Sequence, residues 1–378
     1  MIRHFDRIIL ISPGGRSGGG GIGSVTDGIA RWIEINDVDV RVSVLDPRGE
    51  GTVLLSPLYL ISAFVQAIFL SIISRRVIFH VQVSERTSVI RKGIFVFLGR
   101  LLRKRTILHH HGAEFESFYL GANQSLMLWT KSIVTMAHVN IVLGRKAAEF
   151  LVDIVGATPS RVCVLPNAVS DLRSHVQSIR QRSVSASHPQ SGATNLLLLA
   201  NLSPRKGVSE FLAALSELHA EGIPVHAVLC GGGEINRYRQ EARQLGLDDD
   251  VVEFTGWVNR DEVRSILART DVFVLPSFNE GLPMSILEAV SAEIPVVTTP
   301  VGAIPEVFTD GVNCLLVPPG DSQALKSAIN KLISNPRLAK ALTANARALY
   351  QDNFALESYM ERLQTIYADG GCPKHPTR

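Results

Sequence analysis

Cysteine is scarce in this sequence, and its spacing excludes motifs built on close cysteine pairs. The chain has 378 residues and four cysteines, none within a Cys-x-x-Cys pair: Cys163, Cys230, Cys314 and Cys372. The first three lie in apolar, strand-like runs, where a thiol packs as a small hydrophobic group. We therefore expect no disulfide framework, and a reducing cytosol fits this usage.

A strong net charge is also missing. The formal charge of +3 is too small to indicate nucleic-acid binding by itself. Apolar residues make up 46% of the chain and charged residues 19%, a balance that indicates a buried globular core and argues against disorder. The first apolar run is too short for a signal peptide, and Asp6 precedes it. A chain of this length predicts two domains.

Short β-branched runs alternate with longer helical stretches. In the first half the expected strands are 7–12, 39–45, 76–81, 105–110, 139–143 and 161–165. The alternation restarts with 195–202, 225–231, 251–256, 272–277, 295–300 and 313–318. Runs this apolar predict strands buried on both faces of a parallel sheet. We therefore expect an α/β fold with two Rossmann-like, doubly wound domains.

Residues 171–193 separate the two halves. They are rich in Ser, Arg and Gln and poor in large apolar side chains, which predicts a linker or an adjoining loop. We expect an N-terminal domain at 1–170 and a second domain at 194–352. The tail reads as helical, and its last helix, within 353–378, is expected to cross back onto the first domain. No short-period repeat is visible.

The segment FNEGLPMSILEAV carries the strongest chemical signal. Glu280 lies in a turn after a strand, Pro283 is placed to open a helix, and Glu288 follows within that helix. The backbone N–H groups of Gly281 and Leu282, with the helix dipole behind them, form a site for an anionic or hydroxyl-rich ligand. A ligand with a sugar at one end and a ribose at the other could span both carboxylates. The alternative is an ordinary helix with a surface Glu, which the position at a strand end disfavours.

A second strand-to-helix junction carries two cations. The run 195–202 leads into Pro204, Arg205, Lys206 and Gly207 and then a helix. At the carboxyl end of a strand, Arg205 and Lys206 would meet a pyrophosphate. The alternative is a solvated pair of charges, but positive charge at a helix N-terminus is locally unfavourable.

A glycine-rich run, 12–24, follows the first strand directly. Its amides can approach phosphates closely. Gly18, Gly20 and Gly23 also satisfy Gly-x-Gly-x-x-Gly, and Asp46 ends the next strand, so an NAD-dependent oxidoreductase is an alternative. A dinucleotide fingerprint turns immediately after the strand, whereas a longer loop precedes these glycines. We therefore prefer a loop that covers phosphates.

Three consecutive histidines end a strand beside two glutamates, which raises the possibility of zinc. Because a strand alternates its faces, His109 and His111 point one way and His110 the other. No second ligand cluster lies near in the sequence, so we expect no metal site and interpret His111 as a hydrogen-bonding residue. The acidic run 248–250 is expected to be an exposed turn.

Two stretches bear on membrane contact. Residues 53–73 carry no charge, and a segment of this length is long enough to span a membrane. A span there would split a domain, so we expect a helix packed on the sheet, with room for one exposed apolar face. Residues 91–105 carry six Lys or Arg and no acid, a pattern typical of a basic amphipathic helix lying on anionic lipid. The alternative for the second stretch is a solvated basic face.

Taken in order, these motifs resemble those of glycosyltransferase family 4. The resemblance covers about the whole chain and is most specific over 195–320, and residues 164–170 resemble the segment leading into the family's interdomain connection. It implies the GT-B fold, in which two Rossmann-like domains face each other across a cleft. One departure is Asn201, which stands where the family usually has an Arg, five residues before Lys206. Arg205 is the candidate replacement.

The resemblance also implies roles for the matching residues. Glu280 and His111 would contact the transferred sugar, and Glu288 would contact the nucleotide ribose. Lys206 and Arg205 would hold the diphosphate. Further donor-binding residues implied by the family pattern are Gly19, Gly20, Asn201, Trp257, Val258, Gly281, Leu282, Pro283 and Met284.

The family's activity is a retaining transfer that needs no metal and no cofactor beyond the nucleotide-sugar substrate. We expect a hexose to move from GDP-mannose or a UDP-sugar to a lipid-linked glycan acceptor, in exopolysaccharide or other cell-envelope polysaccharide synthesis. The expected location is the cytoplasmic face of the cell membrane, held peripherally by its anionic surface, with no nucleic-acid partner. The alternatives are the NAD-dependent oxidoreductase and a catalytically silent sugar-nucleotide-binding subunit.

Overall fold

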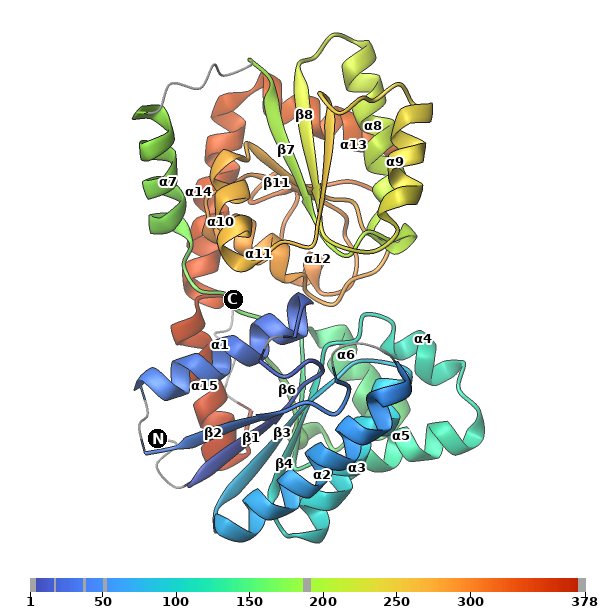
Figure 1. Cartoon of the computed structure of the whole chain (residues 1–378), viewed down its shortest axis with the longest axis vertical. Helices are drawn as coiled ribbons and strands as arrows, with labels where there is room; N and C mark the ends of the chain where they lie inside the picture. Colours follow the sequence, from blue (N-terminus) through green and yellow to red (C-terminus); the bar gives the residue numbers. More distant parts are fainter. Residues whose placement is uncertain (1–4, 17, 37–38, 50–52, 186–191, 373–378) are drawn as a thin grey trace. The chain divides into compact units, whose positions relative to one another are not determined.

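The chain forms two compact units, each with its own sheet (Figure 1). The computed structural model describes residues 5–16, 18–36, 39–49, 53–185 and 192–372. The first unit combines Met1–Ala168 with Leu356–Arg378, and the second is Val169–Ala355. Each unit holds a six-stranded sheet in which neighbouring strands pair in parallel. The predicted α/β class with two doubly wound sheets is confirmed.

The sheet of the first unit has the strand order β2-β1-β3-β4-β5-β6. Its strands are β1 (Arg7–Ile11), β2 (Arg41–Leu45), β3 (Val77–Val83), β4 (Arg105–His110), β5 (Val139–Val142) and β6 (Val162–Val164). Its helices are α1 (Gly20–Asn36), α2 (Ser56–Ile73), α3 (Thr87–Leu101), α4 (Phe115–Leu120), α5 (Gln124–Met136), α6 (Arg145–Phe150) and α15 (Leu356–Asp369), with shorter turns η1 (Val53–Leu55), η2 (Leu151–Val155) and η3 (Pro159–Arg161). Each of the six strands lies within a predicted run or differs from it by a few residues.

Strand β3 is buried along its whole length because helices cover both faces of the sheet. Phe79 and Val81 belong to the apolar core that α3 and α5 complete. His80 and Gln82 point to the opposite face, since side chains alternate along a strand. There α15 packs, and the Tyr367 hydroxyl lies 2.7 Å from His80 Nδ1.

The sheet of the second unit has the strand order β12-β11-β10-β7-β8-β9. Its strands are β7 (Thr194–Leu199), β8 (Val225–Cys230), β9 (Val252–Gly256), β10 (Val272–Leu275), β11 (Val296–Thr298) and β12 (Leu315–Leu316). Its helices are α7 (Arg173–Ser185), α8 (Val208–Ala220), α9 (Ile235–Gln244), α10 (Arg260–Arg269), α11 (Met284–Ser291), α12 (Ile304–Val307), α13 (Ser322–Ser334) and α14 (Pro336–Asn353), with the turn η4 (Pro204–Lys206). Because β7 and β10 are neighbours, the segments that follow them leave the sheet side by side.

Helix α7 occupies most of the segment expected as a linker. Residues 186–191 of that segment lie outside the described residues. Arg180 of α7 donates to the carbonyl oxygens of Ala268 and Thr270, at 2.9 and 3.2 Å. These carbonyls end α10, where a cation is favoured by the helix dipole. The polar composition therefore reflects a surface helix attached to the second unit.

The basic stretch 91–105 is partly bonded within the first unit and partly exposed. It lies mostly in α3, where Lys92 is 1% exposed. Arg91 donates to Ser56 Oγ, Lys104 to the Ser74 carbonyl oxygen, and Arg105 to two carbonyl oxygens that end α15. Three of the six cations thus bond within the unit and Lys92 is buried, whereas Arg100 and Arg103 are exposed. The expected contact of this stretch with anionic lipid stays a prediction.

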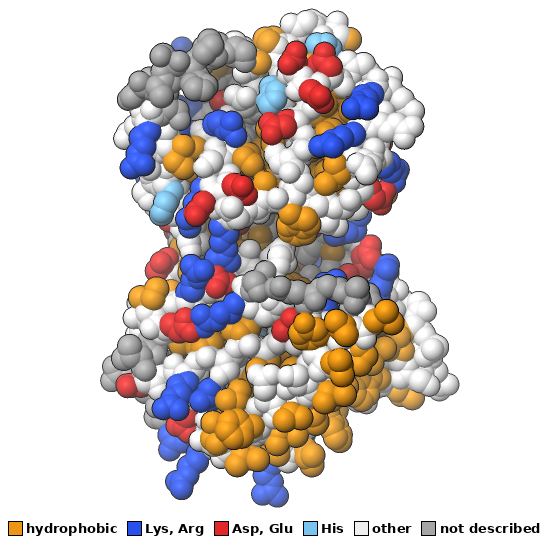
Figure 2. Space-filling model, in the orientation of Figure 1, with side chains coloured by type: hydrophobic (Ala, Val, Ile, Leu, Met, Phe, Trp, Pro, Cys, Tyr) orange, Lys and Arg blue, Asp and Glu red, His pale blue; other side chains and the backbone are white. Residues whose placement is uncertain are grey.

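Helix α2 instead presents a large apolar surface. Its fully buried residues are small and include Ala63, Ala67 and Ser71. Four large side chains, Leu60, Phe64, Ile68 and Leu70, are partly buried against the core, whereas the others are exposed. The exposed ones, with neighbours from η1 and α3, are Leu54, Leu55, Leu58, Tyr59, Ile61, Val65, Phe69, Ile72, Ile73, Ile90, Phe97 and Leu101. We call this set the α2 surface, and Figure 2 shows hydrophobic side chains gathered there. By length and composition α2 could cross a membrane, with 22% of its apolar window buried.

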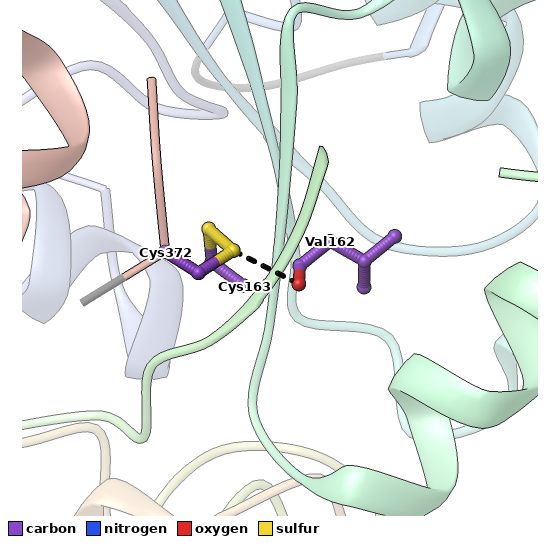
Figure 3. Close-up of a disulfide and its surroundings, with 3 residues drawn as sticks. All are labelled: Val162, Cys163 and Cys372. Atoms are coloured by element: carbon purple, nitrogen blue, oxygen red, sulfur yellow. Dashed lines mark hydrogen bonds between the residues drawn. A yellow bond between two sulfur atoms is a disulfide. The ribbon is translucent and has the colours of Figure 1, made fainter. Parts of the chain in front are cut away.

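A disulfide bond joins Cys163 of β6 to Cys372, which follows α15 (Figure 3). The expectation of no disulfide was wrong. The two cysteines are 209 residues apart in the sequence, and only the return of α15 to the first unit brings them together. Cys230 and Cys314 are buried free thiols, as predicted.

Replacing Cys372 with Ser is expected to lower the free energy of unfolding of the first unit by roughly 2–4 kcal/mol, because the bond restricts the unfolded chain. Calorimetry of the variant and the wild type, each with and without reductant, measures the loss. Reduced wild type should melt like the variant. Melting that responds to neither reductant nor substitution would show that the bond contributes no stability.

Candidate functional site

The second unit holds a buried carboxylate at the carboxyl edge of its sheet. After β10 the chain turns through Ser277 and Glu280 before α11 begins at Met284. Glu280 is 6% exposed, and the Ser277 hydroxyl donates to its Oε1 over 2.7 Å. A charge this buried needs strong partners.

Two cations from a distant part of the sequence are those partners. Lys206 Nζ donates to Glu280 Oε1 over 2.5 Å, and Arg205 Nη1 lies 3.7 Å from Glu280 Oε2. Arg205 also donates to the carbonyl oxygen of Asn279. Burial lowers the pKa of Lys206, and the charge of Glu280 opposes that shift. The two junctions that the sequence marked separately therefore form one cluster.

This cluster can bind two kinds of group. Lys206 has three N–H donors and Arg205 has five, so each keeps donors for an anion beyond its bonds to the turn. The Glu280 carboxylate can accept hydrogen bonds from hydroxyl groups. The arrangement suits a ligand that carries a phosphate next to a polyol.

The loop after β11 supports the Glu280 turn and was overlooked in the sequence. The amide of Ala303 donates to the Gly281 carbonyl oxygen over 2.9 Å. Gly302 has φ of +58°, and a Cβ there would lie 1.8 Å from the Glu280 carbonyl oxygen. Only glycine fits this contact. In the sequence, the sign of this contact was a glycine, Gly302, that follows shortly after a predicted strand.

The turn continues directly into α11. Leu282 is 3% exposed, and Pro283 precedes the helix as its N-cap rather than opening it. Met284 is the first helical residue. No side chain caps this end, so its first amides, with the positive end of the helix dipole, are available to a ligand.

Glu288, in the second turn of α11, is half-buried. Burial raises the pKa of Glu288 to about 7, and the charge of Arg260 opposes the shift. Arg260, Trp257 and Val258 all line a pocket of about 910 Å³ beside β9 and α10. Arg260 therefore lies in the lining of the pocket and also acts through its charge on the Glu288 carboxyl.

Three consecutive glycines after β8 were also overlooked. A Cβ on Gly231 would lie 1.9 Å from the Ala200 carbonyl oxygen, and one on Gly232 would lie 2.1 Å from the Trp257 indole nitrogen. The glycines therefore pack directly on the segment leading to Asn201, which is exposed, and on Trp257. Glycine repeats at a strand's carboxyl end are the signal that identifies such close packing.

In the first unit, His111 follows β4 and is hydrogen-bonded through Nε2 to Gln82 Oε1. The rings of His109 and His111 lie 4.1 Å apart between centroids, while His110 turns away and bonds to Asn140 over 3.1 Å. The predicted alternation is confirmed. In the part of the chain that is described, no three His, Cys, Asp or Glu side chains are grouped to hold a metal ion.

The glycine run of the first unit joins β1 to α1. The amide of Gly14 donates to Asp46 Oδ1 over 2.9 Å. Gly19 and Gly20 are exposed at the start of α1, and residue 17 lies outside the described residues. The Asp46 carboxylate is thus bonded to the glycine-rich loop. This bond argues against the NAD alternative, in which Asp46 would bind a ribose.

Comparison with protein families gives a match over the cluster of the second unit. Residues 181–349 match the model of "Glycosyl transferases group 1". The amylovoran biosynthesis glycosyltransferase AmsK of Erwinia amylovora is 25% identical over 270 residues, 70% of this chain and 60% of that protein. A GDP-mannose-dependent α-(1-6)-phosphatidylinositol monomannoside mannosyltransferase of Mycolicibacterium smegmatis is 31% identical over 179 residues, 45% of this chain and 47% of that protein. The chain thus spans three fifths or less of the length of these relatives.

Solved structures extend the likeness to nearly the whole chain. Anabaena HepE, solved in complex with UDP and glucose, superposes with a TM-score of 0.74 at 18% identity, covering 97% of this chain and all of that one. At this identity the likeness shows the fold alone. It is the GT-B fold that the sequence predicted.

Replacing Glu288 with Gln is expected to stabilise the protein above pH 7. The wild-type carboxyl has its pKa raised from 4.5 to about 7, so the folded state binds more protons than the unfolded state between these values. Wild-type stability therefore falls as pH rises through this window, and Gln escapes a loss of about 2 kcal/mol. Urea unfolding at a series of pH values measures the difference.

The gain should vanish as the pH falls well below 4.5, where the carboxyl is protonated in both states. Glu253→Gln is the matched control, because Glu253 of β9 is exposed and its loss should change little. A Glu288→Gln variant less stable than wild type at pH 8 would contradict the desolvation argument.

Proposed function

We propose that this chain is a group 1 glycosyltransferase, the family whose model residues 181–349 match, and that it is a retaining hexosyltransferase. Its donor is a nucleotide-diphosphate sugar, GDP-mannose or a UDP-sugar. Its acceptor is a lipid-linked glycan in cell-envelope polysaccharide synthesis. The observation that carries this proposal is the buried Glu280, held by Lys206 and Arg205 at the carboxyl edge of the sheet.

The cluster suits the charges that develop in glycosyl transfer. Breaking a sugar–phosphate bond leaves negative charge on the diphosphate and positive charge on the anomeric carbon. Lys206 and Arg205 stabilise the diphosphate, and Glu280 accepts hydrogen bonds from sugar hydroxyls. A diphosphate oxygen takes the proton of the acceptor on the face that it leaves, which gives retention. Because the two cations supply the positive charge, we propose transfer without a metal or a cofactor.

The remaining predicted residues keep their proposed roles. Glu288 binds the ribose, and Trp257 with Val258 binds the base. The N-terminal end of α11, from Gly281 to Met284, binds the sugar and phosphates, while Asn201 lies beside the glycines after β8. In the first unit, His111 contacts the sugar, and Gly19 and Gly20 contact the phosphates.

The names of the relatives support a nucleotide-sugar donor without deciding its base. One relative is GDP-mannose-dependent, and HepE was solved with UDP and glucose. AmsK is named for polysaccharide biosynthesis. The NAD alternative is weakened by the bond between Asp46 and Gly14. A silent sugar-nucleotide-binding subunit is distinguished by the assay below.

Glu280→Gln is expected to lower kcat/KM by roughly 100- to 1,000-fold. Gln keeps the volume and an acceptor oxygen but loses the charge that orients Lys206. Gln is preferable to Ala, which would leave a cavity beside two uncompensated cations. Release of nucleoside diphosphate measures turnover, after a thermal-shift panel of sugar nucleotides has identified the donor.

The matched control is Glu221→Gln, which removes a surface ion pair with Lys326 in the same unit and should leave turnover unchanged. Near-normal turnover by Glu280→Gln would refute the assignment. Binding of a sugar nucleotide without turnover in the wild type would favour the silent subunit.

For location, we propose that the enzyme binds the anionic inner face of the cell membrane through the α2 surface. Large apolar side chains normally face a protein's interior, but on α2 the fully buried residues are small and most of the large ones are exposed. An apolar surface this extensive indicates a partner. Phe64 of α2 packs on Phe95 of α3 at 6.2 Å between ring centroids, so the helix is anchored to the unit along one side.

Charge favours a lipid partner over a second copy of the chain. Between residues 53 and 105 the sequence has nine Lys or Arg and a single acid, Glu85. Of these cations, Arg75, Arg76, Arg86, Arg100 and Arg103 are exposed. A basic border around an apolar surface is attracted to anionic headgroups, whereas two copies would repel each other.

Replacing Ile61 and Phe69 together with Asp is expected to weaken binding to vesicles by about a hundredfold or more, since each buried apolar side chain contributes about 1.5–3 kcal/mol. Co-sedimentation with vesicles of phosphatidylcholine and phosphatidylglycerol measures binding. Ile35→Asp, which changes an exposed residue of α1, is the control and should bind as wild type. Equal binding by wild type and the double variant, or a concentration-dependent dimer that the double variant abolishes, would refute the membrane proposal.

A further inference from the structure

Buried polar side chains line the sheet face behind His111. His80 and Gln82 of β3, His109 of β4 and Tyr367 of α15 are each 0% exposed. Gln82 lies opposite His109 in the register of the two strands, and α15 packs against this sheet (Figure 1). The central strands of a parallel sheet are normally apolar. A polar layer in this position therefore needs its own hydrogen bonds.

These side chains form one continuous chain of hydrogen bonds. The Tyr367 hydroxyl lies 2.7 Å from His80 Nδ1. His80 Nε2 lies 3.1 Å from His109 Nδ1 and 3.4 Å from Gln82 Nε2. Gln82 Oε1 is bonded to His111 Nε2. The chain thus leads from the last helix of the unit to His111.

One atom beside the chain bears on the direction of its bonds. His109 Nε2 is buried and has no hydrogen-bond partner among the residues that the structure describes. A buried lone pair without a partner is tolerated better than a buried N–H without one. A proton on His109 Nδ1 would be donated to His80 Nε2, and His80 Nδ1–H would then be donated to the Tyr367 hydroxyl. That direction leaves the Tyr367 O–H without an acceptor in the described part of the chain, and the opposite direction leaves a His109 Nε2–H without one.

The Gln82 amide selects between these two directions. Its nitrogen can only donate and faces His80 Nε2, so His80 Nε2 accepts, and its oxygen faces His111. An amide oxygen can only accept, so His111 carries its proton on Nε2. Burial lowers the pKa of His80 to about 3 and the pKa values of His109 and His111 well below the ordinary value, so all three rings are neutral near pH 7.

We propose that Gln82, His80 and Tyr367 are positioning residues that hold His111 as its Nε2–H tautomer, with Nδ1 presented to the donor sugar as a hydrogen-bond acceptor. His111 is half-buried, so a ligand can reach its ring. In this tautomer it accepts a bond from a sugar hydroxyl and does not supply a proton through Nδ1. The sugar contact rests on the proposed function, whereas the tautomer is a property of the protein alone.

The first test is side-chain ¹⁵N NMR of the full chain, labelled at histidine and free of sugar nucleotide. The His111 resonances are assigned with the variant His111→Asn. We expect a protonated Nε2 and an unprotonated Nδ1 near pH 7. A protonated Nδ1, or a mixture of tautomers in the wild type, overturns the proposal.

The second test uses matched variants. Gln82→Met removes the amide at similar volume, so His111 should become a mixture of tautomers and kcat/KM should fall roughly 10- to 100-fold. Gln82→Glu should keep the Nε2–H signal and most of the activity, because a buried protonated carboxyl offers the same donor and acceptor.

Tyr367→Phe should mix the tautomers of His80. Tyr359→Phe removes another buried hydroxyl from α15, one without a partner among the described residues, and should change neither signal.

The spectra and the kinetics separate this inference from the proposed function. If Gln82→Met mixes the tautomers but the wild type turns over no sugar nucleotide, the positioning stands and the function fails. If transfer occurs but Gln82→Met leaves the His111 tautomer unchanged, the function stands and the positioning fails. If Gln82→Met does not fold, the wild-type spectrum and the two tyrosine variants still test the proposed tautomer of His111.

Discussion

The ion pair between Glu280 and Lys206 is the constraint on which the second unit's site depends. Glu280 is 6% exposed and the Lys206 side chain 12%. Removing Glu280 would leave the buried charge of Lys206 without its partner, at a cost of about 3–5 kcal/mol, whereas removing Lys206 would leave Glu280 with Arg205 alone as its cation. The pair connects the turn after β10 to the turn after β7. The same contact that closes this edge of the sheet therefore fixes a carboxylate and two cations where a polar ligand would bind.

The first unit orders its polar groups without charge. His80, Gln82 and His109 are bonded to one another and to Tyr367 as neutral groups. Helix α15 is attached to the unit at several points: the hydroxyl of Tyr367, the Arg105 bonds to its last carbonyls and the disulfide at Cys372. The helix that completes the fold is thus also the helix that ends the hydrogen-bonded chain to His111.

In helices α2 and α3 the structure differs from what composition suggests about which side chains are buried. The stretch with the basic, amphipathic pattern became a packed helix, with Lys92 inside and Arg105 bonded to α15. The uncharged stretch before it became a surface. A parallel crossover needs only one side of its helix against the sheet, and on α2 small residues such as Ala63 and Ala67 fill that side. Leu60, Phe64, Ile68 and Leu70 pack partly against the core, and the other large side chains of α2 remain exposed.

The sequence alone determined the strands, the parallel sheets and the two junctions marked by Glu280 and by Lys206, because burial on both faces and turn chemistry are recorded in local runs of residues. It did not determine which of these runs would meet. Lys206 reaches Glu280 across 74 residues only because β7 and β10 are neighbours, and Cys163 reaches Cys372 across 209 only because α15 returns to the first unit. Strand order and chain return depend on packing among distant segments, and so the contacts of the site, the disulfide and the chain behind His111 were decided by the tertiary structure.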